Sequence, residues 1–265
     1  TDCAGECGGS VVDLGCGCGE AGPSGCDYVC GSTLENDECG VCDGSGPGGD
    51  FICNSSGDGY TFKPATKEAL QTAVDMWIDD NATVLSTYGE INTWDVSLIT
   101  DMTELFKNKA TFNDDISNWD VSNVTDMGHM FQLASIFNGD LSNWNVSNVT
   151  DMRVMFKKAS SFNGNLSNWD VSNVTDMRWM FGYAISFNQD ISSWNISNVA
   201  EMLNMFTNTP ALSDENKCVI DASFQTNSHW PYDWCDCTDT LGGTAVEDEC
   251  GVCDGGNAGM DCAGV

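Results

Sequence analysis

The chain has 265 residues, of which 40 are acidic and 9 are basic, so its formal net charge is −31. A chain of this length can bury a sizeable core in one large domain or two smaller ones. The negative charge repels nucleic acid phosphates and anionic lipid, which excludes both as expected partners. The sequence has no apolar run long enough for membrane insertion and shows no signal peptide, so we expect a removed signal or a longer parent chain.

Residues 1–59 form the first expected module, which contains eleven acidic residues, nine cysteines and no Lys or Arg. The segment is rich in Gly and Asp and has few apolar residues with which to form a core. Cysteines in such a segment indicate disulfides and an extracellular or cell-surface location. The disulfide candidates of the whole chain are Cys3, Cys7, Cys16, Cys18, Cys26, Cys30, Cys39, Cys42, Cys53, Cys218, Cys235, Cys237, Cys250, Cys253 and Cys262.

The motif D-E-C-G-V-C-D-G at 37–44 returns within 247–255. C-x-x-C pairs also bind zinc, but no His lies near either pair, so disulfides are favoured. A thioredoxin-like role needs a helix at the pair, which the surrounding Gly and Asp disfavour. Asp43, Asp50 and Asp58 are candidate calcium ligands, although plain solvation of this acidic segment is the favoured explanation. We expect no other cofactor.

Residues 60–90 are predicted to form an N-terminal helical cap. Thr66 is a suitable N-cap residue, and Leu70, Ala73, Val74 and Trp77 then fall on one helical face. A repeat protein needs such a cap because an open end exposes a cross-section of the core.

Residues 91–210 contain a repeat with a fixed period of 25 residues. Trp94, Trp119, Trp144, Trp169 and Trp194 follow it, as do the methionines from Met102 to Met202. A fixed period of this size indicates a solenoid whose units bury their apolar faces against their neighbours. The expected fold class is α/β: a leucine-rich-repeat-like, right-handed solenoid of about five units, with short parallel strands, short helices and disulfide-rich irregular flanks.

Within one unit, L-x-x-W-x-V is predicted to form a short strand and M-x-x-M-F-x-x-A one or two helical turns. The predicted inward residues of the unit 141–163 are Leu141, Trp144, Val146, Val149, Met152, Met155, Phe156, Ala159 and Phe162.

Residues 118–138, N-W-D-V-S-N-V-T-D-M-x-x-M-F-x-x-A-x-x-F-N, resemble the leucine-rich-repeat class and more closely the BspA-like family of surface proteins. The segments 61–77 and 211–234 are similar to the regions that flank the repeats in that family. The resemblance covers roughly residues 60–234 and implies a cell-surface or adhesive protein, without a defined ligand.

The positions between the predicted inward residues carry small polar side chains. Hydroxyls, amides and carboxylates bind sugars and calcium, but any soluble repeat needs polar residues outside. The ligand-face candidates are Asp95, Asp120, Asn145, Asp170 and Asn195. The candidate glycosylation sites are Asn54, Asn81, Asn145, Asn165 and Asn195, whereas Asn123, Asn148 and Asn173 are expected to bond turn backbone instead.

The residues that differ between units lie at the start of the predicted helical segment: 103–104, 128–129, 153–154, 178–179 and 203–204. Six of the nine basic residues gather on this side, at Lys107, Lys109, Arg153, Lys157, Lys158 and Arg178. A locally basic face on an acidic chain is suited to binding copies of the same chain, and solvated side chains explain it as well.

Residues 211–234 are predicted to form a C-terminal cap with Ser213 as N-cap residue before Val219 and Ala222. Residues 235–265 form a second Cys-rich module. Its last letters, D-C-A-G, repeat those at 2–5, so we expect this module to continue beyond residue 265.

The two histidines, His129 and His229, are expected at a variable surface position and packed in the cap, respectively. No catalytic or nucleotide-binding motif accompanies them, so no enzymatic activity is expected. The sequence favours a non-enzymatic extracellular structural protein, a subunit of a surface filament, coat or matrix whose partners are copies of itself or neighbouring modules. The alternatives are an adhesion module that binds glycans or a protein through its polar face, and a weaker one, ice or mineral binding.

Overall fold

The computed structural model describes residues 23–235, apart from residues 25, 28, 31 and 47. The candidate cysteines Cys3, Cys7, Cys16, Cys18, Cys237, Cys250, Cys253 and Cys262 lie outside these residues. The chain divides into two compact units, Thr1–Lys63 and Pro64–Val265. No helix among the described residues has the length and apolar character that a membrane span requires.

Disulfides and two small antiparallel sheets build the N-terminal unit. Strand β1 (Pro23–Ser24) pairs with β2 (Val29–Cys30), and β3 (Phe51–Cys53) pairs with β4 (Tyr60–Phe62). The disulfides Cys26–Cys42 and Cys39–Cys53 lie in this unit. Cys39 and Cys42 therefore bond to other cysteines rather than to each other or to zinc. Their cross-links hold a segment that has little apolar core of its own.

A helix begins after Thr66, as predicted for residues 60–90. Helix α1 (Lys67–Asp79) begins after Thr66, whose side chain accepts a hydrogen bond from the amide of Ala69 at 3.2 Å. Its buried residues are the predicted ones: Leu70, Ala73, Val74 and Trp77. Helix α2 (Asn81–Tyr88) follows with Asp80 as its N-cap residue, and a 3-10 turn, η1 (Ile91–Thr93), leads into the repeats.

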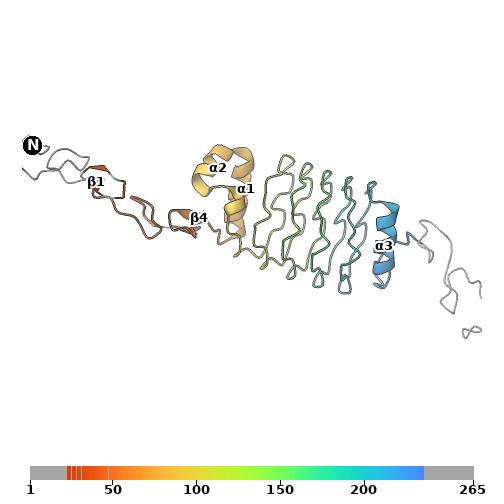
Figure 1. Cartoon of the computed structure of the whole chain (residues 1–265). Coiled ribbons are helices and arrows are strands. Elements are labelled where there is room, and N and C mark those ends of the chain that lie inside the picture. Colours follow the sequence, from red (N-terminus) through yellow and green to blue (C-terminus); the bar gives the residue numbers. More distant parts are fainter. Residues whose placement is uncertain (1–22, 25, 28, 31, 47, 236–265) are drawn as a thin grey trace, which may run out of the picture. The chain divides into compact units, whose positions relative to one another are not determined.

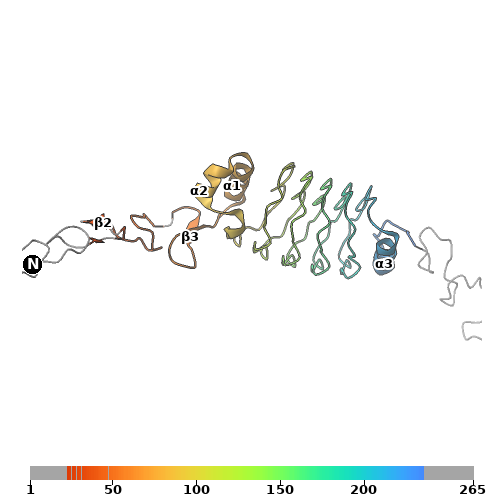
Figure 2. The same cartoon turned by 45° about the horizontal axis from the view of Figure 1, so that its top comes forward.

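The 25-residue units form five stacked coils, which Figures 1 and 2 show side by side between α1 and α3. We number them coil 1 (94–118), coil 2 (119–143), coil 3 (144–168), coil 4 (169–193) and coil 5 (194–212). Isolated parallel bridges join Asp101, Asp126, Asp151, Asp176 and Glu201 in succession. In coil 1 the amides of Met102, Glu104, Phe106 and Asn108 donate to carbonyls of coil 2 at 2.8–3.0 Å. The same pattern recurs in coils 2, 3 and 4, so backbone hydrogen bonds fix the stacking register.

The core consists of side-chain columns that run through the stack. All predicted inward residues of 141–163 are buried, with exposed fractions of 3% or less. The rings of Phe131, Phe156 and Phe181 are nearly parallel, with centroids 5.5 and 5.8 Å apart in the two steps. Each tryptophan from Trp119 to Trp194 donates its indole N–H to a carbonyl of the preceding turn at 2.8–3.1 Å. The apolar period thus sets the core, and each indole bond ties a tryptophan to backbone 28 residues earlier.

The predicted strands and helices within each unit are wrong. Between residues 94 and 212 the coils consist of turns and single bridges. In coil 1 the turns Met102–Leu105 and Phe106–Lys109 each close through an i+3 amide, at 3.3 and 3.1 Å. Their third residues, Glu104 and Asn108, have φ of +63°. Such left-handed residues interrupt a helix and send alternate amides to the next coil.

The C-terminal cap is helix α3 (Asp214–Phe224), which begins after Ser213 as predicted, since its hydroxyl accepts from the amide of Asn216. Val219 and Ala222, which follow this N-cap in the sequence, are exposed. The helix instead buries Cys218, Ile220, Asp221 and Phe224. Asp221 accepts the indole N–H of Trp230 and the amides of Trp234 and Cys235, while the disulfide Cys218–Cys235 closes the segment.

Candidate functional site

The polar face of the coils uses its repeated Asp and Asn side chains to hold turns. The side-chain Oδ1 of each ligand-face candidate accepts the amide two residues later at 3.0–3.2 Å. The pairs are Asp95 with Ser97, Asp120 with Ser122, Asn145 with Ser147, Asp170 with Ser172 and Asn195 with Ser197. These contacts lower the pKa of Asp170, the Ser172 hydroxyl contributing most and its amide next. Asx turns of this kind explain the repeated letters without any ligand.

A second polar column joins the coils. The side-chain amides of Asn123, Asn148, Asn173 and Asn198 each donate to a serine carbonyl of the previous coil at 2.7–2.8 Å. Thr125, Thr150 and Thr175 make similar bonds to the threonine carbonyl one coil earlier, each at 3.1 Å. The expected bonding of repeat Asn side chains to turn backbone is therefore observed.

The candidate glycosylation sites differ in their surroundings. Asn145, Asn165 and Asn195 are exposed and use Oδ1 to hold a serine amide. Asn81 is exposed at the start of α2. Asn54 uses both side-chain atoms inside its own loop, with Nδ2 bonded to Asp58 and Oδ1 accepting the amides of Gly57 and Asp58.

The carboxylates at the coil bridges form a column partly neutralised by cations. Lys67 of α1 pairs with Asp101 at 2.9 Å, Arg153 with Asp151, and Arg178 with Asp176 at 2.6 Å. Burial raises the pKa of Asp151, and the neighbouring carboxylates add to the rise against the opposing effect of Arg153. The column is thus held by the coil geometry at an electrostatic cost.

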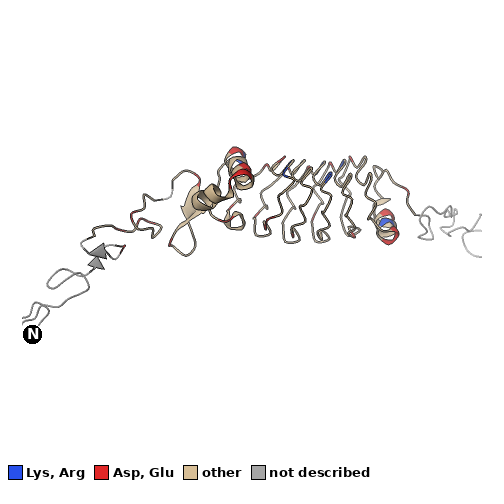
Figure 3. Ribbon diagram, turned by 90° about the horizontal axis from the view of Figure 1, so that it is seen from above, with Lys and Arg blue, Asp and Glu red and all other residues tan. Residues whose placement is uncertain are grey.

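The residues that vary between coils define what we call the turn face: residues 103–109 of coil 1 and their equivalents at steps of 25. Figure 3 shows basic residues of the repeats along one edge of the coils. In three coils the left-handed residue pairs with the side chain three positions later. Glu104 binds Lys107 at 2.6 Å, His129 binds Gln132 at 2.8 Å, and Thr207 donates to Asn204 at 3.2 Å. These three turns satisfy their own polar groups.

Coils 3 and 4 depart from this pairing. Lys157 reaches across to Trp179 of coil 4, with its Nζ 3.8 Å from the ring centroid, and Lys158 lies over Tyr183 at 5.8 Å. The two rings are nearly parallel, with centroids 6.3 Å apart. Gly182 takes the position that Lys107 or Gln132 occupies elsewhere, and a Cβ there would lie 2.8 Å from the Trp179 ring. We call Lys157, Lys158, Trp179, Gly182 and Tyr183 the lysine–aromatic patch.

The sequence located the basic side of the repeats but not the patch. The 25-residue period alone places Lys158 beside Tyr183, so the register contained the signal. The contact of Lys157 with Trp179 spans 22 residues and follows only from the turn geometry. The interpretation of the turn segment as helix concealed this contact.

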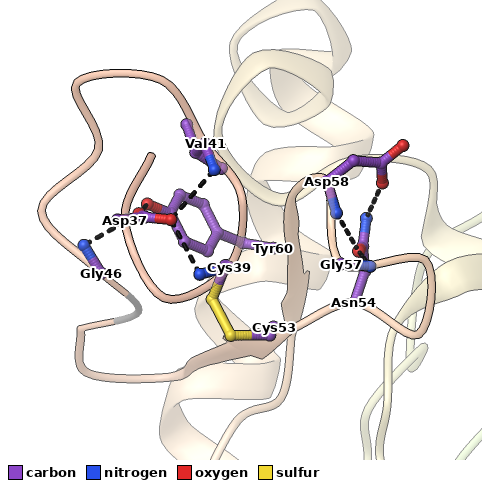
Figure 4. Close-up of a disulfide and its surroundings, with 9 residues drawn as sticks. All are labelled: Asp37, Cys39, Val41, Gly46, Cys53, Asn54, Gly57, Asp58 and Tyr60. Atoms are coloured by element: carbon purple, nitrogen blue, oxygen red, sulfur yellow. Dashed lines mark hydrogen bonds between the residues drawn. A yellow bond between two sulfur atoms is a disulfide. The ribbon is translucent and has the colours of Figure 1, made fainter. Parts of the chain in front are cut away.

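The motif around Cys39 is organised by the carboxylate of Asp37 (Figure 4). Asp37 accepts the amides of Cys39, Val41 and Gly46 at 2.8–3.0 Å and a hydrogen bond from the hydroxyl of Tyr60. The Tyr60 bond, followed by the three amides, lowers the pKa of Asp37 against some desolvation. The repeated Asp of D-E-C-G-V-C-D-G thus builds a loop in its first copy, while the second copy lies outside the described residues.

The calcium candidates do not form one cluster. No group of three His, Cys, Asp or Glu side chains within the described residues is placed to hold a metal ion, and this includes Asp43, Asp50 and Asp58. Asp58 instead accepts hydrogen bonds from Ser56 and Asn54, which lower its pKa, the Ser56 hydroxyl contributing most.

The prediction that His229 is packed is wrong, because its side chain is exposed. It lines a hollow of about 390 Å³ together with Trp194, Asn195 and Ser223. His129 is half-buried in its turn with Nδ1 at Gln132. Within the described residues, neither imidazole has an observed hydrogen bond to a nucleophilic side chain.

The comparisons with known proteins identify a family and no individual relative. The family model described as "Mycoplasma protein of unknown function, DUF285" matches residues 76–168 and 142–229. No curated protein and no solved structure matches the chain. The two matches together span 76–229, more than half of the 265 residues. The chain therefore belongs to the DUF285 family.

Proposed function

We propose that the protein is a non-enzymatic, extracellular structural protein, a subunit of a surface filament, coat or matrix. In this proposal the five coils are a leucine-rich-repeat-like, right-handed solenoid of the BspA-like kind. The disulfides support an oxidising compartment. The coils serve as a rigid spacer between cysteine-rich segments.

The observation that carries the proposal is the use made of the repeated polar residues. On the polar face, Asp120, Asn145 and Asp170 hold turns, and the Asn123 column joins the coils. No buried side-chain polar atom within the described residues lacks a hydrogen-bond partner. Repetition therefore serves rigidity and register, which is what a structural rod requires.

The alternative is adhesion through the polar face. Its candidate side chains are exposed but already hold serine amides, so a ligand has to bind around turns rather than between free groups. Replacing Asp120, Asn145 and Asp170 together by Ala separates the two functions. Adhesion predicts lost binding to glycan arrays with the fold unchanged. The structural proposal predicts a lower melting temperature instead.

The proposal is tested with the full, non-reduced chain purified from an oxidising host. Sedimentation velocity over a wide concentration range and negative-stain electron microscopy should show concentration-dependent oligomers that extend in one direction. A protein that stays monomeric at every concentration, in low and moderate salt and with or without calcium, would contradict a role as an assembling subunit. The calcium arm also tests Asp43, Asp50 and Asp58 as ligands.

A further inference from the structure

We infer that the lysine–aromatic patch of one copy binds the acidic disulfide module, residues 23–63, of another copy. This inference rests on the proposed function and names the two surfaces that would join the subunits. It is a head-to-tail contact, because the two surfaces lie on different parts of the chain.

The charge of the patch favours an acidic partner. Lys157 and Lys158 have no carboxylate within ion-pair distance among the described residues, although the chain has a net charge of −31. By contrast, Lys107 pairs with Glu104 of its own turn face, and Arg153 and Arg178 pair with the bridge carboxylates Asp151 and Asp176. Two ammonium groups without a counter-charge are suited to an acidic partner.

The two aromatic residues of the patch have an unfavourable backbone conformation. Trp179 and Tyr183 have φ of +58° and +61°, a region that bulky residues rarely adopt. Coil 5 has Asn204 and Asn208 at the equivalent positions, and Asn tolerates this conformation much better. Local propensity therefore does not account for the two aromatic residues, and Gly182 leaves the space that the Trp179 ring occupies.

Apolar side chains are exposed in and near the patch. Tyr183 is 38% exposed and Leu203, on the turn face of coil 5, is 58% exposed. Tyrosine, tryptophan and arginine dominate the binding energy of protein interfaces, and exposed leucine adds apolar area. A protein surface is therefore favoured over a simple anion as the occupant.

The acidic module is complementary to the patch in charge and in apolar surface. Residues 23–63 contain seven acidic residues and one basic residue, Lys63, and Glu35, Glu38 and Asp43 are exposed. The same module exposes Ile52 and Tyr60 of its β3–β4 hairpin, at 39% and 38%. It thus offers carboxylates and apolar groups to a surface of ammonium groups and rings.

The geometry of such a contact has a consequence for assembly. A contact between two different surfaces of identical chains leaves one of each surface free at the two ends of an oligomer that has not closed. Growth then continues into a ring or an open filament. This matches the filament or coat of the proposed function.

The first experiment compares assembly of the wild type with K157Q/K158Q by sedimentation velocity. Loss of both ammonium groups should raise the concentration for half-assembly by about tenfold, and W179A by about thirtyfold, as expected for exposed charge pairs and an aromatic anchor. N118D/N168D is the matched control, because it makes the same change in net charge at exposed positions of the polar face and should assemble like the wild type. Circular dichroism and melting curves verify that each variant is folded.

The second experiment identifies the occupant by charge exchange. K157E/K158E and E35K/E38K should each remain monomeric alone and assemble when mixed, because each then presents the charge that the other needs. A mixture that stays monomeric although both variants are folded would overturn the inference.

The remaining outcomes separate the two proposals. If the wild type assembles and K157Q/K158Q assembles equally well, the inference is wrong and the proposed function stands. If K157Q/K158Q instead loses retention on a dextran sulfate matrix while its assembly is unchanged, the patch binds an acidic polysaccharide and the inference is again overturned. A wild type that never assembles removes both proposals.

Discussion

Val154 provides a direct test of the turn geometry of the coils. It is the third residue of the turn Met152–Met155 and has φ of +62°, in the left-handed region. Because its side chain is branched at Cβ, this conformation is strongly disfavoured. The equivalent residue of coil 5 is Asn204, which is far better suited to it. We therefore compare the substitutions Val154→Asn and Val154→Ala.

The comparison isolates the backbone, because both substitutions remove the same half-buried apolar side chain. Left-handed backbone costs a residue with a Cβ roughly 1–2 kcal/mol, and Asn recovers part of this cost through local hydrogen bonds. V154N should therefore be more stable than V154A by about 1 kcal/mol. For a domain of this size, this corresponds to a difference in melting temperature of about 2–4 °C.

The assay is thermal unfolding of the full, non-reduced chain, followed by circular dichroism and tryptophan fluorescence. The sign of the difference decides the result. If residues 152–159 formed a helix, Ala would be favoured over Asn by about 0.6 kcal/mol. A V154A protein that melts at or above the temperature of V154N would therefore refute the left-handed turn.

Three further predictions concern the core and two carboxylates. F156A removes a fully buried ring between Phe131 and Phe181 and should lower the free energy of unfolding in denaturant by about 3–5 kcal/mol. L203A, on a largely exposed side chain, should change this free energy by no more than about 0.5 kcal/mol. A cost below about 1 kcal/mol for F156A would contradict the stacked core. D151N should raise the melting temperature at pH 7, because burial raises the folded-state pKa of Asp151 and folding therefore disfavours the ionised carboxylate. This gain in melting temperature should vanish as pH falls below the unfolded-state pKa near 3.8. A gain that persists at pH 2 would show another cause. The lowered pKa of Asp37, set mainly by the Tyr60 hydroxyl, has the opposite effect on stability. The Asp37 carboxylate stabilises the N-terminal unit above the unfolded-state pKa, and this stabilisation is lost as pH falls through the folded-state pKa. D37N should therefore lower stability at pH 6 and differ little from the wild type at pH 2, as measured by amide exchange of Cys39 and Val41 referenced to intrinsic rates; equal protection at pH 6 would contradict the role of Asp37.

The core of the coils was predictable because a fixed period leaves one consistent way to align the apolar residues. Trp144, Met152 and Phe156 are all buried as predicted. The two N-caps, Thr66 and Ser213, were predictable for a local reason, since one hydroxyl precedes each helix. In both cases the signal lies in the identity or spacing of single residues.

The turn structure was not predictable from the same spacing. Apolar residues at M-x-x-M-F fit both a helix and two consecutive turns, because the first and last residues of each turn also lie three positions apart. Gly or Asn would have marked the left-handed positions, but Asn occupies only three of the ten, and residues such as Glu104, Val154 and Trp179 occupy the other seven. Stacking against the next coil compensates for their unfavourable conformation, and such tertiary compensation leaves no local signal.

The polar face contained a signal that was interpreted too broadly. Asp or Asn two residues before Ser, as in D-V-S at 120–122, is the pattern of an Asx turn. Treating these side chains as a free ligand surface overlooked their local hydrogen bonds. The second half of α3 misled for another reason, since the apolar Val219 is exposed while the polar Asp221 is buried to receive Trp230.

The coils separate the residues that set the shape from those able to set the partner. Shape depends on the Trp, Met and Phe columns and on backbone hydrogen bonds that any residue can make. The turn-face side chains project from these bonds and differ in every coil, from the Glu104–Lys107 pair to the Trp179–Tyr183 rings. Substitution there changes surface chemistry at a backbone cost of about 1–2 kcal/mol per residue and leaves the stacking register intact. If Trp179 and Lys157 determine which surface binds, transferring coil 4 side chains to the turn of coil 2 should create a second patch on an unchanged rod.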